Sequence, residues 1–291
     1  MEQLTSVTPK SIHPATHIGL VTLRVAQLVR SLAYYVDILG FQLQEQTPGT
    51  ALLGAQDGTA LLRLLEVAGI PSQPRSSSGL YHVAILLPSR TDLGRFLLRI
   101  AEAGLEIGQG DHIVSEALYL SDPDENGLEV YRDRPRAGWT WQDGLVKMGV
   151  GPVDVRGLIA EARQSGQPWE SMPAGTTVGH IHLRVGDVAL ARDFYHTTLG
   201  FDVVQQMHGA LFVSAGGYHH HVGLNSWESQ GAGQASQHTA GLQVYEILVP
   251  DRAALEPIQA RLTARNVPYQ ELSNGLNVAD PWQNQILIRI A

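Results

Sequence analysis

An internal repeat is the feature that most constrains how this chain can fold. Residues 23–41 contain LRV, SLAYY and LGF, and residues 183–201 contain LRV, ARDFY and LGF at an offset of 160 residues. Each stretch predicts a β-strand, an amphipathic helix closed by a glycine, and a further strand. A second pair, GLYHVAILLPSR at 79–90 and GLQVYEILVPDR at 241–252, is offset by 162 residues and predicts another strand and helix.

The repeat predicts an α+β fold of four modules, each with one strand, one helix and about three strands. The modules begin near four positions: Ile18, Tyr81, His180 and Gln243. We expect two modules in residues 14–134 and two in residues 176–291. Residues 135–175 are rich in Gly, Pro and Trp, so we expect a connector there, with one short helix at 155–164.

Composition limits the partners and the chemistry. The formal net charge is −8 and no cluster of Lys and Arg is present, which argues against nucleic acid or an anionic membrane as a partner. Cysteine is absent while histidine occurs 12 times, so any metal must be held by His and carboxylates. The N-terminal MEQLTSVTPKSIHP has no apolar leader pattern and no stretch approaches a membrane span, so we expect a cytoplasmic protein.

Candidate metal ligands emerge when the repeats are compared position by position. Polar residues of the second and third modules align with aliphatic residues of the fourth and first: His82 with Val244, Glu129 with Leu287, and His180 with Leu20. His221 likewise aligns with Leu61. A single strand histidine is usually a packed residue, and Glu129 could face solvent on its strand. The joint placement at equivalent positions favours one shared site.

This distribution constrains how the modules pair. If modules paired in sequence order, His82 and Glu129 would lie in one cup and His180 in another, and neither site would be complete. If the second and third modules pair, one cup holds all three residues, and the first and fourth form a metal-free cup. Two neutral imidazoles and one carboxylate form the facial triad that leaves open positions on Fe(II).

The sequence also resembles a known family. The strand–helix–strands repeat, the Tyr…Leu-Gly-Phe signature and the run DPDENGLE resemble the vicinal oxygen chelate superfamily, which includes glyoxalases, bleomycin-resistance proteins and extradiol dioxygenases. Within it, GLYHVAILLPSR, GDHIVSEALYLSDPDENGLEVYRDRPR and GHIHLRV are similar to bacterial two-domain catechol 2,3-dioxygenases of the bacillus type. The resemblance implies βαβββ modules whose mixed sheets curl into cups with helices outside.

The resemblance further implies a reaction and a metal. By position, His82, His180 and Glu129 would hold Fe(II), and the enzyme would cleave the ring of a small aromatic diol with O₂. Mn, Zn or Ni is compatible with the same ligands in a recombinant sample, and the chain could form a homo-oligomer. In the best-known extradiol enzymes the ligands come from the last two modules, so here the central pair must take that role.

Four further residues match positions near the metal of extradiol enzymes. The pair His220-His221 matches an acid/base position, and Tyr119 and His112 match groups that hydrogen-bond the substrate. We choose His221 as the acid/base, because on an extended strand it shares a face with His219 while His220 points away.

Other aromatic and histidine residues are assigned to lesser roles. Tyr131, on the strand face of Glu129, is a candidate for the pocket wall, and His182 is either close to the ligands or simply packed. The remaining histidines are expected to be structural or at the surface: His13, His17, His196, His208 and His238.

Two other functions stay open at this point. A glyoxalase-like isomerase or lyase would use Ni or Zn with a fourth ligand, which would lie among residues 219–221. A ligand-sequestering resistance-type protein would bind an apolar molecule in a cup without turnover.

Overall fold

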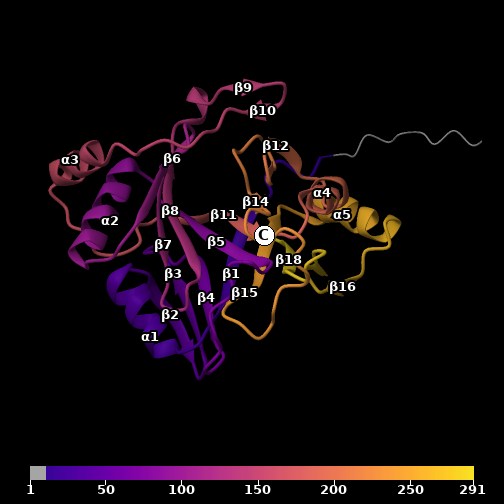
Figure 1. Cartoon of the computed structure of the whole chain (residues 1–291), viewed down its shortest axis with the longest axis horizontal. Coiled ribbons are helices and arrows are strands. Elements are labelled where there is room, and N and C mark those ends of the chain that lie inside the picture. Colours follow the sequence, from indigo (N-terminus) through magenta and orange to yellow (C-terminus); the bar gives the residue numbers. More distant parts are fainter. Residues whose placement is uncertain (1–10) are drawn as a thin grey trace, which may run out of the picture.

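Two eight-stranded sheets pack against each other in the computed structural model, which describes residues 11–291 (Figure 1). The second and third modules build the central-module sheet, with the strands in the spatial order β12 (Asp202–Met207), β13 (Ala210–Ser214), β14 (Val222–Asn225), β11 (Thr177–Arg184), β5 (Gly79–Leu86), β8 (Gly127–Asp133), β7 (Ser115–Ser121) and β6 (Gly108–Asp111). The first and fourth build the outer-module sheet, in the order β16 (Tyr269–Leu272), β17 (Gly275–Ala279), β18 (Gln285–Ile290), β15 (Gly241–Val249), β1 (His17–Val25), β4 (Ala60–Glu66), β3 (Thr50–Gly54) and β2 (Gln42–Thr47).

The predicted pairing of the second and third modules is confirmed. Strands β5 and β11 run antiparallel in the middle of the central-module sheet, and β1 and β15 do the same in the outer-module sheet. Each sheet therefore draws one module from each half of the sequence. The ranges 14–134 and 176–291 are repeats along the chain, and neither forms a sheet of its own.

Three α-helices lie outside the sheets: α2 (Arg90–Glu102), α3 (Val155–Ser165) and α5 (Arg252–Ala264). Each begins at a side chain that accepts a hydrogen bond from the first turn. Ser89 accepts from Asp92 N, Asp154 from Gly157 N and Asp251 from Ala254 N. These caps explain why the helices begin where the sequence changes from strand to helix pattern.

The helices predicted in the first and third modules are only partly α-helical. Each starts as a short α-helix, α1 (Leu28–Leu32) or α4 (Val188–Arg192), and continues as a π-helix, η1 (Ala33–Ile38) or η3 (Asp193–Thr198). The backbone N–H of Leu39 donates to the carbonyl of Tyr34, five residues earlier, and Leu199 donates to Phe194 in the same way. The wider turn recurs at equivalent positions, so it belongs to the repeat.

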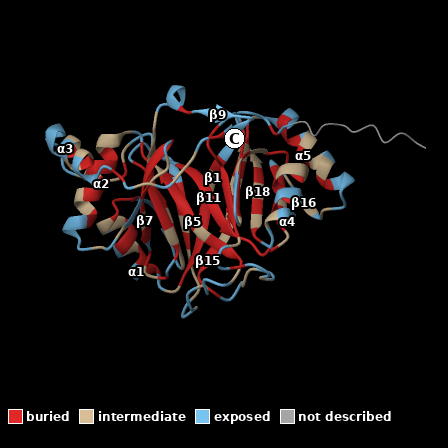
Figure 2. Ribbon diagram, turned by 45° about the horizontal axis from the view of Figure 1, so that its top comes forward, coloured by how far each residue is buried: buried red, intermediate tan, exposed pale blue. Residues whose placement is uncertain are grey.

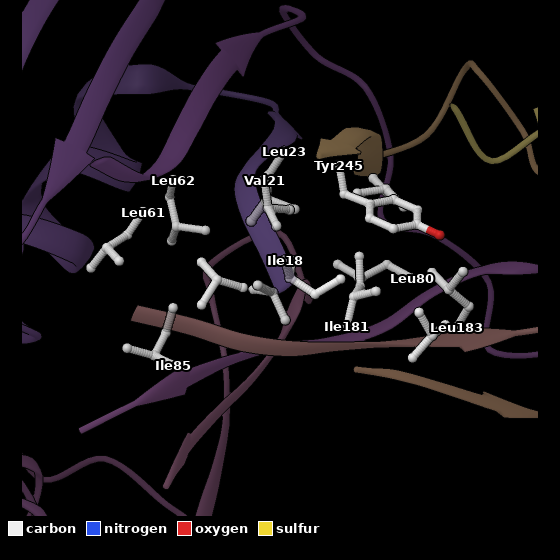
Figure 3. Packing of buried hydrophobic residues seen from close by; sticks show 14 of the residues in the cluster. Ile18, Val21, Leu23, Leu61, Leu62, Leu80, Ile85, Ile181, Leu183 and Tyr245 are labelled. Carbon is white, nitrogen blue, oxygen red and sulfur yellow. The ribbon is translucent and has the colours of Figure 1, made fainter. Parts of the chain in front are cut away.

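The core lies between the two sheets. Figure 3 shows Ile18, Val21 and Leu23 of β1 facing Ile181 and Leu183 of β11. On β11, Ile181 and Leu183 alternate with His180 and His182, which face away from this core. On β1, a register irregularity lies between Ile18 and Val21. Figure 2 shows the buried residues concentrated along the strands and the exposed ones on helices and loops. The face of each sheet that points away from the other sheet does not take part in this core.

Two buried hydrogen bonds tie one sheet to the other. The hydroxyl of Tyr35, in the first module, donates to Asp122 Oδ2 of the second at 3.0 Å. The equivalent Tyr195, in the third module, donates to Asp280 Oδ2 of the fourth, also at 3.0 Å. Burial raises the pKa of both aspartates. The turns at Asp122-Pro123 and Asp280-Pro281 thus anchor neighbouring modules in each half.

The connector is more structured than the sequence predicts. Besides α3, near the predicted 155–164, it contains the 3₁₀ helix η2 (Arg136–Gly138) and the hairpin strands β9 (Trp141–Gln142) and β10 (Leu145–Val146). Helix α3 packs on α2 so closely that a Cβ on Gly94 would lie 2.3 Å from the Leu158 carbonyl oxygen.

The sequence predicts no membrane span and no apolar leader pattern at the N-terminus. No helix within residues 11–291 combines the length and apolar character needed to cross a membrane. Residues 1–10, part of the segment without a leader pattern, lie outside the described residues.

Candidate metal centre

The three predicted ligands come from three adjacent strands in the middle of the central-module sheet. His180 lies on β11, His82 on β5 and Glu129 on β8. His180 is opposite Ala84 and Ala84 is opposite Glu129, while His82 precedes Ala84 by two residues on β5. Residues two apart on a strand share a face, so all three side chains leave the sheet on the side away from the core.

The three side chains converge on one point. Glu129 Oε2 lies 2.9 Å from His82 Nε2 and 3.2 Å from His180 Nε2, and the two nitrogens are 3.4 Å apart. All three residues are at most 6% exposed. Within residues 11–291 this is the one cluster of three His or acidic side chains with ligand atoms so close together.

The protonation states suit metal binding. Burial lowers the pKa of His180 to about 4, so its imidazole is neutral at pH 7. Although burial alone would raise the pKa of Glu129, the imidazoles of His180 and His82 hold it well below its ordinary value. A buried carboxylate beside imidazole nitrogens is a donor set that a divalent cation would neutralise. The residues therefore fit a metal with two nitrogen ligands and one oxygen ligand.

Glycines next to the ligands make room for them. A Cβ on Gly127 would lie 2.0 Å from the Tyr81 carbonyl oxygen and 3.1 Å from the Cβ of His82. A Cβ on Gly179, the residue before His180, would lie 1.8 Å from the hydroxyl of Tyr131. No other residue type fits at these two positions while the neighbours stay in place.

Tyr119 and His112 lie together at the site, as predicted from the resemblance. Tyr119 is directly opposite Glu129 in the β7–β8 ladder, and its hydroxyl donates to His112 Nε2 at 2.6 Å. His112 Nδ1 donates to the carbonyl of Gly149 at 2.9 Å, which fixes the ring and its tautomer. Burial, together with the charge of Glu129, raises the pKa of the Tyr119 hydroxyl, so it remains protonated.

The choice of His221 as the group facing the site is wrong. Its Nδ1 accepts from the backbone N–H of Ala215 at 3.1 Å, and its ring packs on Tyr218, away from the ligands. Burial lowers its pKa to about 3. The alternation rule failed because β14 starts only at Val222, and residues 219–221 follow a turn in which two glycines have positive φ.

His220 takes the position expected of His221. Its ring lies against that of His180, with 4.0 Å between the centroids and 48° between the ring planes. A chain of hydrogen bonds sets its tautomer: His219 Nε2 donates to Asp133 Oδ1 at 3.0 Å, and His220 Nδ1 donates to His219 Nδ1 at 2.8 Å. His220 Nε2 is then the unprotonated nitrogen of a neutral ring.

A cavity of about 290 Å³ opens in front of the ligands. Besides the residues above, it is lined by residues that the sequence did not single out as a wall: Tyr81, Ser115, Met148, Gly149, Val150, His182, Met207, Phe212 and Trp227. Residues 148–150 belong to the connector, whose path over the sheet has no sequence signal. His182, expected either close to the ligands or packed, lines the cavity, and its Nε2 accepts from Asn225 at 3.0 Å.

Tyr131 supports the site from behind instead of lining the cavity. It is fully buried, its ring lies 5.0 Å from that of His180, and its hydroxyl is 2.6 Å from that of Tyr218. The other histidines lie outside the cavity: His13, His17, His208 and His238 are exposed, and His196 is half-buried against the Phe201 carbonyl.

Comparison with known proteins gives relatives of the whole chain. The family model described as "Glyoxalase/Bleomycin resistance protein/Dioxygenase superfamily" matches residues 17–130 and 177–286. A protein of Bacillus subtilis (strain 168) named catechol-2,3-dioxygenase is 45% identical over 278 residues, 93% of this chain and 96% of its own length. A protein of Rhodococcus globerulus named biphenyl-2,3-diol 1,2-dioxygenase 3 is 26% identical over 171 residues, 56% of this chain and 86% of its own length.

Solved structures agree on the fold. A putative dioxygenase from Bacillus subtilis has a TM-score of 0.65 at 13% identity, with 97% of this chain and 86% of that one covered. Glyoxalase I from Zea mays has a TM-score of 0.57 at 14% identity, with 95% of this chain and 92% of that one covered. At these identities the likeness concerns the fold alone.

Proposed function

Because the chain belongs to the glyoxalase/bleomycin resistance protein/dioxygenase superfamily, we propose that it is an Fe(II)-dependent extradiol dioxygenase that opens the ring of a catechol-type diol with O₂. The observation that carries the proposal is the convergence of His82, His180 and Glu129 at the wall of a cavity. The 45% identity to a catechol-2,3-dioxygenase supports the same reaction class.

The ligand set favours this function over an isomerase of the same superfamily. Two imidazoles and one carboxylate occupy one face of an octahedral ion and leave the opposite face to other ligands. When bound, Fe(II) would supply adjacent positions for the two diol oxygens and for O₂ and would carry electron density between them. Among residues 11–291 no fourth His or carboxylate joins the cluster, as a four-ligand Ni or Zn site would require.

Residues around the cavity provide the proton chemistry. His220 is the imidazole placed to take a proton from a diol hydroxyl, because its Nε2 is unprotonated and its ring lies beside that of His180. The Asp133–His219 pair holds that tautomer and can share the positive charge that results. Tyr119, held by His112, offers a hydroxyl beside Glu129 to orient a substrate oxygen.

The shape and lining of the cavity suit a flat ring. Phe212, Met148 and Trp227 provide apolar surface, and the cavity of about 290 Å³ is of the size that a small aromatic molecule needs. Apolar walls also keep water from competing for the metal face. A protein that only sequestered a ligand would not need the Asp133–His219–His220 chain.

The test is metal analysis followed by turnover. Protein purified without oxygen should contain about one iron per chain, and Mn, Zn or Ni in its place would identify a different metal. Addition of catechol in air should consume one O₂ per diol and produce a yellow ring-opened product. Iron at full occupancy without oxygen uptake on any of several catechols would refute the dioxygenase assignment and leave the metal site intact.

A further inference from the structure

Two arginines at equivalent positions of the repeat have opposite surroundings. Arg24 is the penultimate residue of β1 and lies opposite Gly241 of β15, and Arg184 ends β11 and lies opposite Gly79 of β5. Both are more than nine-tenths buried, with exposed fractions of 4% and 8%. The repeat therefore provides a direct comparison of one buried guanidinium in two sites.

Arg24 is fully satisfied by the segment that leads into β15. Its guanidinium donates to the side chains of Gln237 and Gln243 at 3.1 and 2.9 Å, and to the carbonyls of Ser236 and Thr239 at 3.0 and 2.9 Å. Such a network is what a buried arginine needs, because an uncompensated buried charge is costly.

Arg184 has no equivalent network. Its side chain makes no hydrogen bond and no ion pair with any residue in 11–291, and its buried Nε has no acceptor. At the offset of 162 residues, the two glutamines that bind Arg24 are replaced by Arg75 and Tyr81. The Pro74 carbonyl, which corresponds to that of Ser236, accepts from Ser77 instead. The site of Arg184 therefore lacks the two glutamine acceptors and contains a second cation, Arg75.

Arg184 and Arg75 line a second cavity, of about 570 Å³. This cavity shares four lining residues with the metal cavity: Tyr81, His82, Tyr119 and Trp227. Two exposed carboxylates, Glu125 and Glu228, also line it, and neither forms an ion pair with Arg184. Burial lowers the pKa of Arg184, and the field of Glu228 opposes that shift. The cavity therefore holds a buried, unpaired guanidinium next to the metal ligands.

We propose that Arg184, assisted by Arg75, binds a carboxylate, and that the substrate is an aromatic diol with a carboxylate-bearing substituent. The diol oxygens would lie at the His82–Glu129–His180 cluster and the substituent would pass Tyr81 and Trp227 into the second cavity. A planar guanidinium matches a carboxylate with two parallel hydrogen bonds, which supplies the acceptors that Arg184 lacks. The substrate part of this proposal rests on the proposed dioxygenase function.

A binding experiment tests the subsite without turnover. Phenylacetate and its neutral isostere phenylacetamide are titrated into the iron-loaded protein, and binding is followed by calorimetry. Wild type should bind phenylacetate more tightly, and Arg184→Met should weaken that binding about ten- to hundredfold, with little effect on phenylacetamide. Arg252→Met, which removes an exposed arginine on α5, is the matched control and should behave as wild type.

Equal affinity for the two probes in wild type, or an unchanged preference in Arg184→Met, would overturn the subsite. If Arg184→Met does not fold, Arg184→Lys and Arg75→Met decide the question. Lysine should keep part of the preference for phenylacetate, and Arg75→Met should weaken phenylacetate several-fold. Full wild-type affinity in Arg75→Met would then count against the proposal.

Oxygen uptake separates the subsite from the reaction. With 3,4-dihydroxyphenylacetate, Arg184→Met should raise KM about ten- to hundredfold with little change in kcat, while KM for 4-methylcatechol should stay near the wild-type value. A phenylacetate preference without uptake on any diol would refute the dioxygenase function and preserve the carboxylate subsite. Uptake with equal KM effects on both diols would refute the carboxylated substrate and preserve the dioxygenase.

Discussion

The imidazole of His220 lies against that of His180, with 4.0 Å between the ring centroids and 48° between the ring planes. One ring is a proposed metal ligand and the other is held in a fixed tautomer by His219 and Asp133. His221, the next residue along the chain, points away from His180, and its Nδ1 accepts a hydrogen bond from the backbone N–H of Ala215. Neighbouring histidines in one short segment therefore have separable roles.

Replacing His220 with glutamine should lower kcat for catechol about 10²- to 10⁴-fold while iron content stays near one per chain, because a general base is lost and no ligand is removed. The measurement is initial-rate oxygen uptake together with metal analysis. His221→Gln is the matched control and should keep kcat per folded molecule, although its stability will fall. Equal losses of kcat in both variants would contradict the assignment to His220.

Replacing His82 or His180 with alanine, or Glu129 with glutamine, should reduce iron retention after gel filtration to near zero. Each change removes one of the three proposed ligands. His17→Ala, an exposed histidine on the other sheet, should retain metal as wild type does. Full metal content in any of the three ligand variants would disprove the proposed centre.

The metal-free protein should lose stability as the pH falls below about 6.5. Burial lowers the pKa of His221 from 6.5 to about 3, so between these values the unfolded chain binds a proton that the folded chain does not. Its contribution is therefore present above pH 6.5 and lost as the pH falls. From pH 7 to pH 5 this one group should lower the free energy of unfolding by about 2 kcal/mol.

The measurement is urea unfolding of the metal-free protein at pH 7 and at pH 5. His221→Phe, which has no titrating group at that position, should show a smaller difference between the two pH values. If His221→Phe showed the same difference as wild type, the loss of stability at low pH would come from groups other than His221.

Replacing Tyr35 with phenylalanine should lower the free energy of unfolding by about 1–3 kcal/mol, because Asp122 loses a donor in a buried place. Tyr195→Phe should cost a similar amount, since Tyr195 makes the equivalent bond to Asp280. Because the two bonds lie in different halves, the effects should add in the double variant. Unchanged urea midpoints in both single variants would show that these bonds do not stabilise the packing of the sheets.

Much of the fold and of the ligand set could be predicted because both depend on comparing the repeats. In the outer modules the positions of the three predicted ligands are occupied by aliphatic residues, Val244, Leu287 and Leu20. Only the pairing of the second module with the third therefore completes a site. The observed contact of β5 with β11 is the predicted one. Strand alternation then places the side chains on the correct face.

What could not be predicted depends on loop geometry. The orientation of His220 is set by a turn at Gly216 and Gly217, where both residues have positive φ and the period of two is lost. Trp227 and residues 148–150 reach the cavity through the paths of a loop and the connector, which periodicity does not encode. The sequence does not indicate that Gln237 and Gln243 bind Arg24, so it could not show that Arg184 lacks the equivalent acceptors.

The crossed pairing of the modules also sets an order for folding during synthesis. Strand β5 meets its partner β11 once about two thirds of the chain has been made, whereas β1 waits for β15 near the C-terminus. Until then β1 presents an open edge of backbone N–H and C=O groups, a template for pairing with other chains. The first module, which carries none of the proposed metal ligands, thus keeps an open strand edge for the longest part of synthesis.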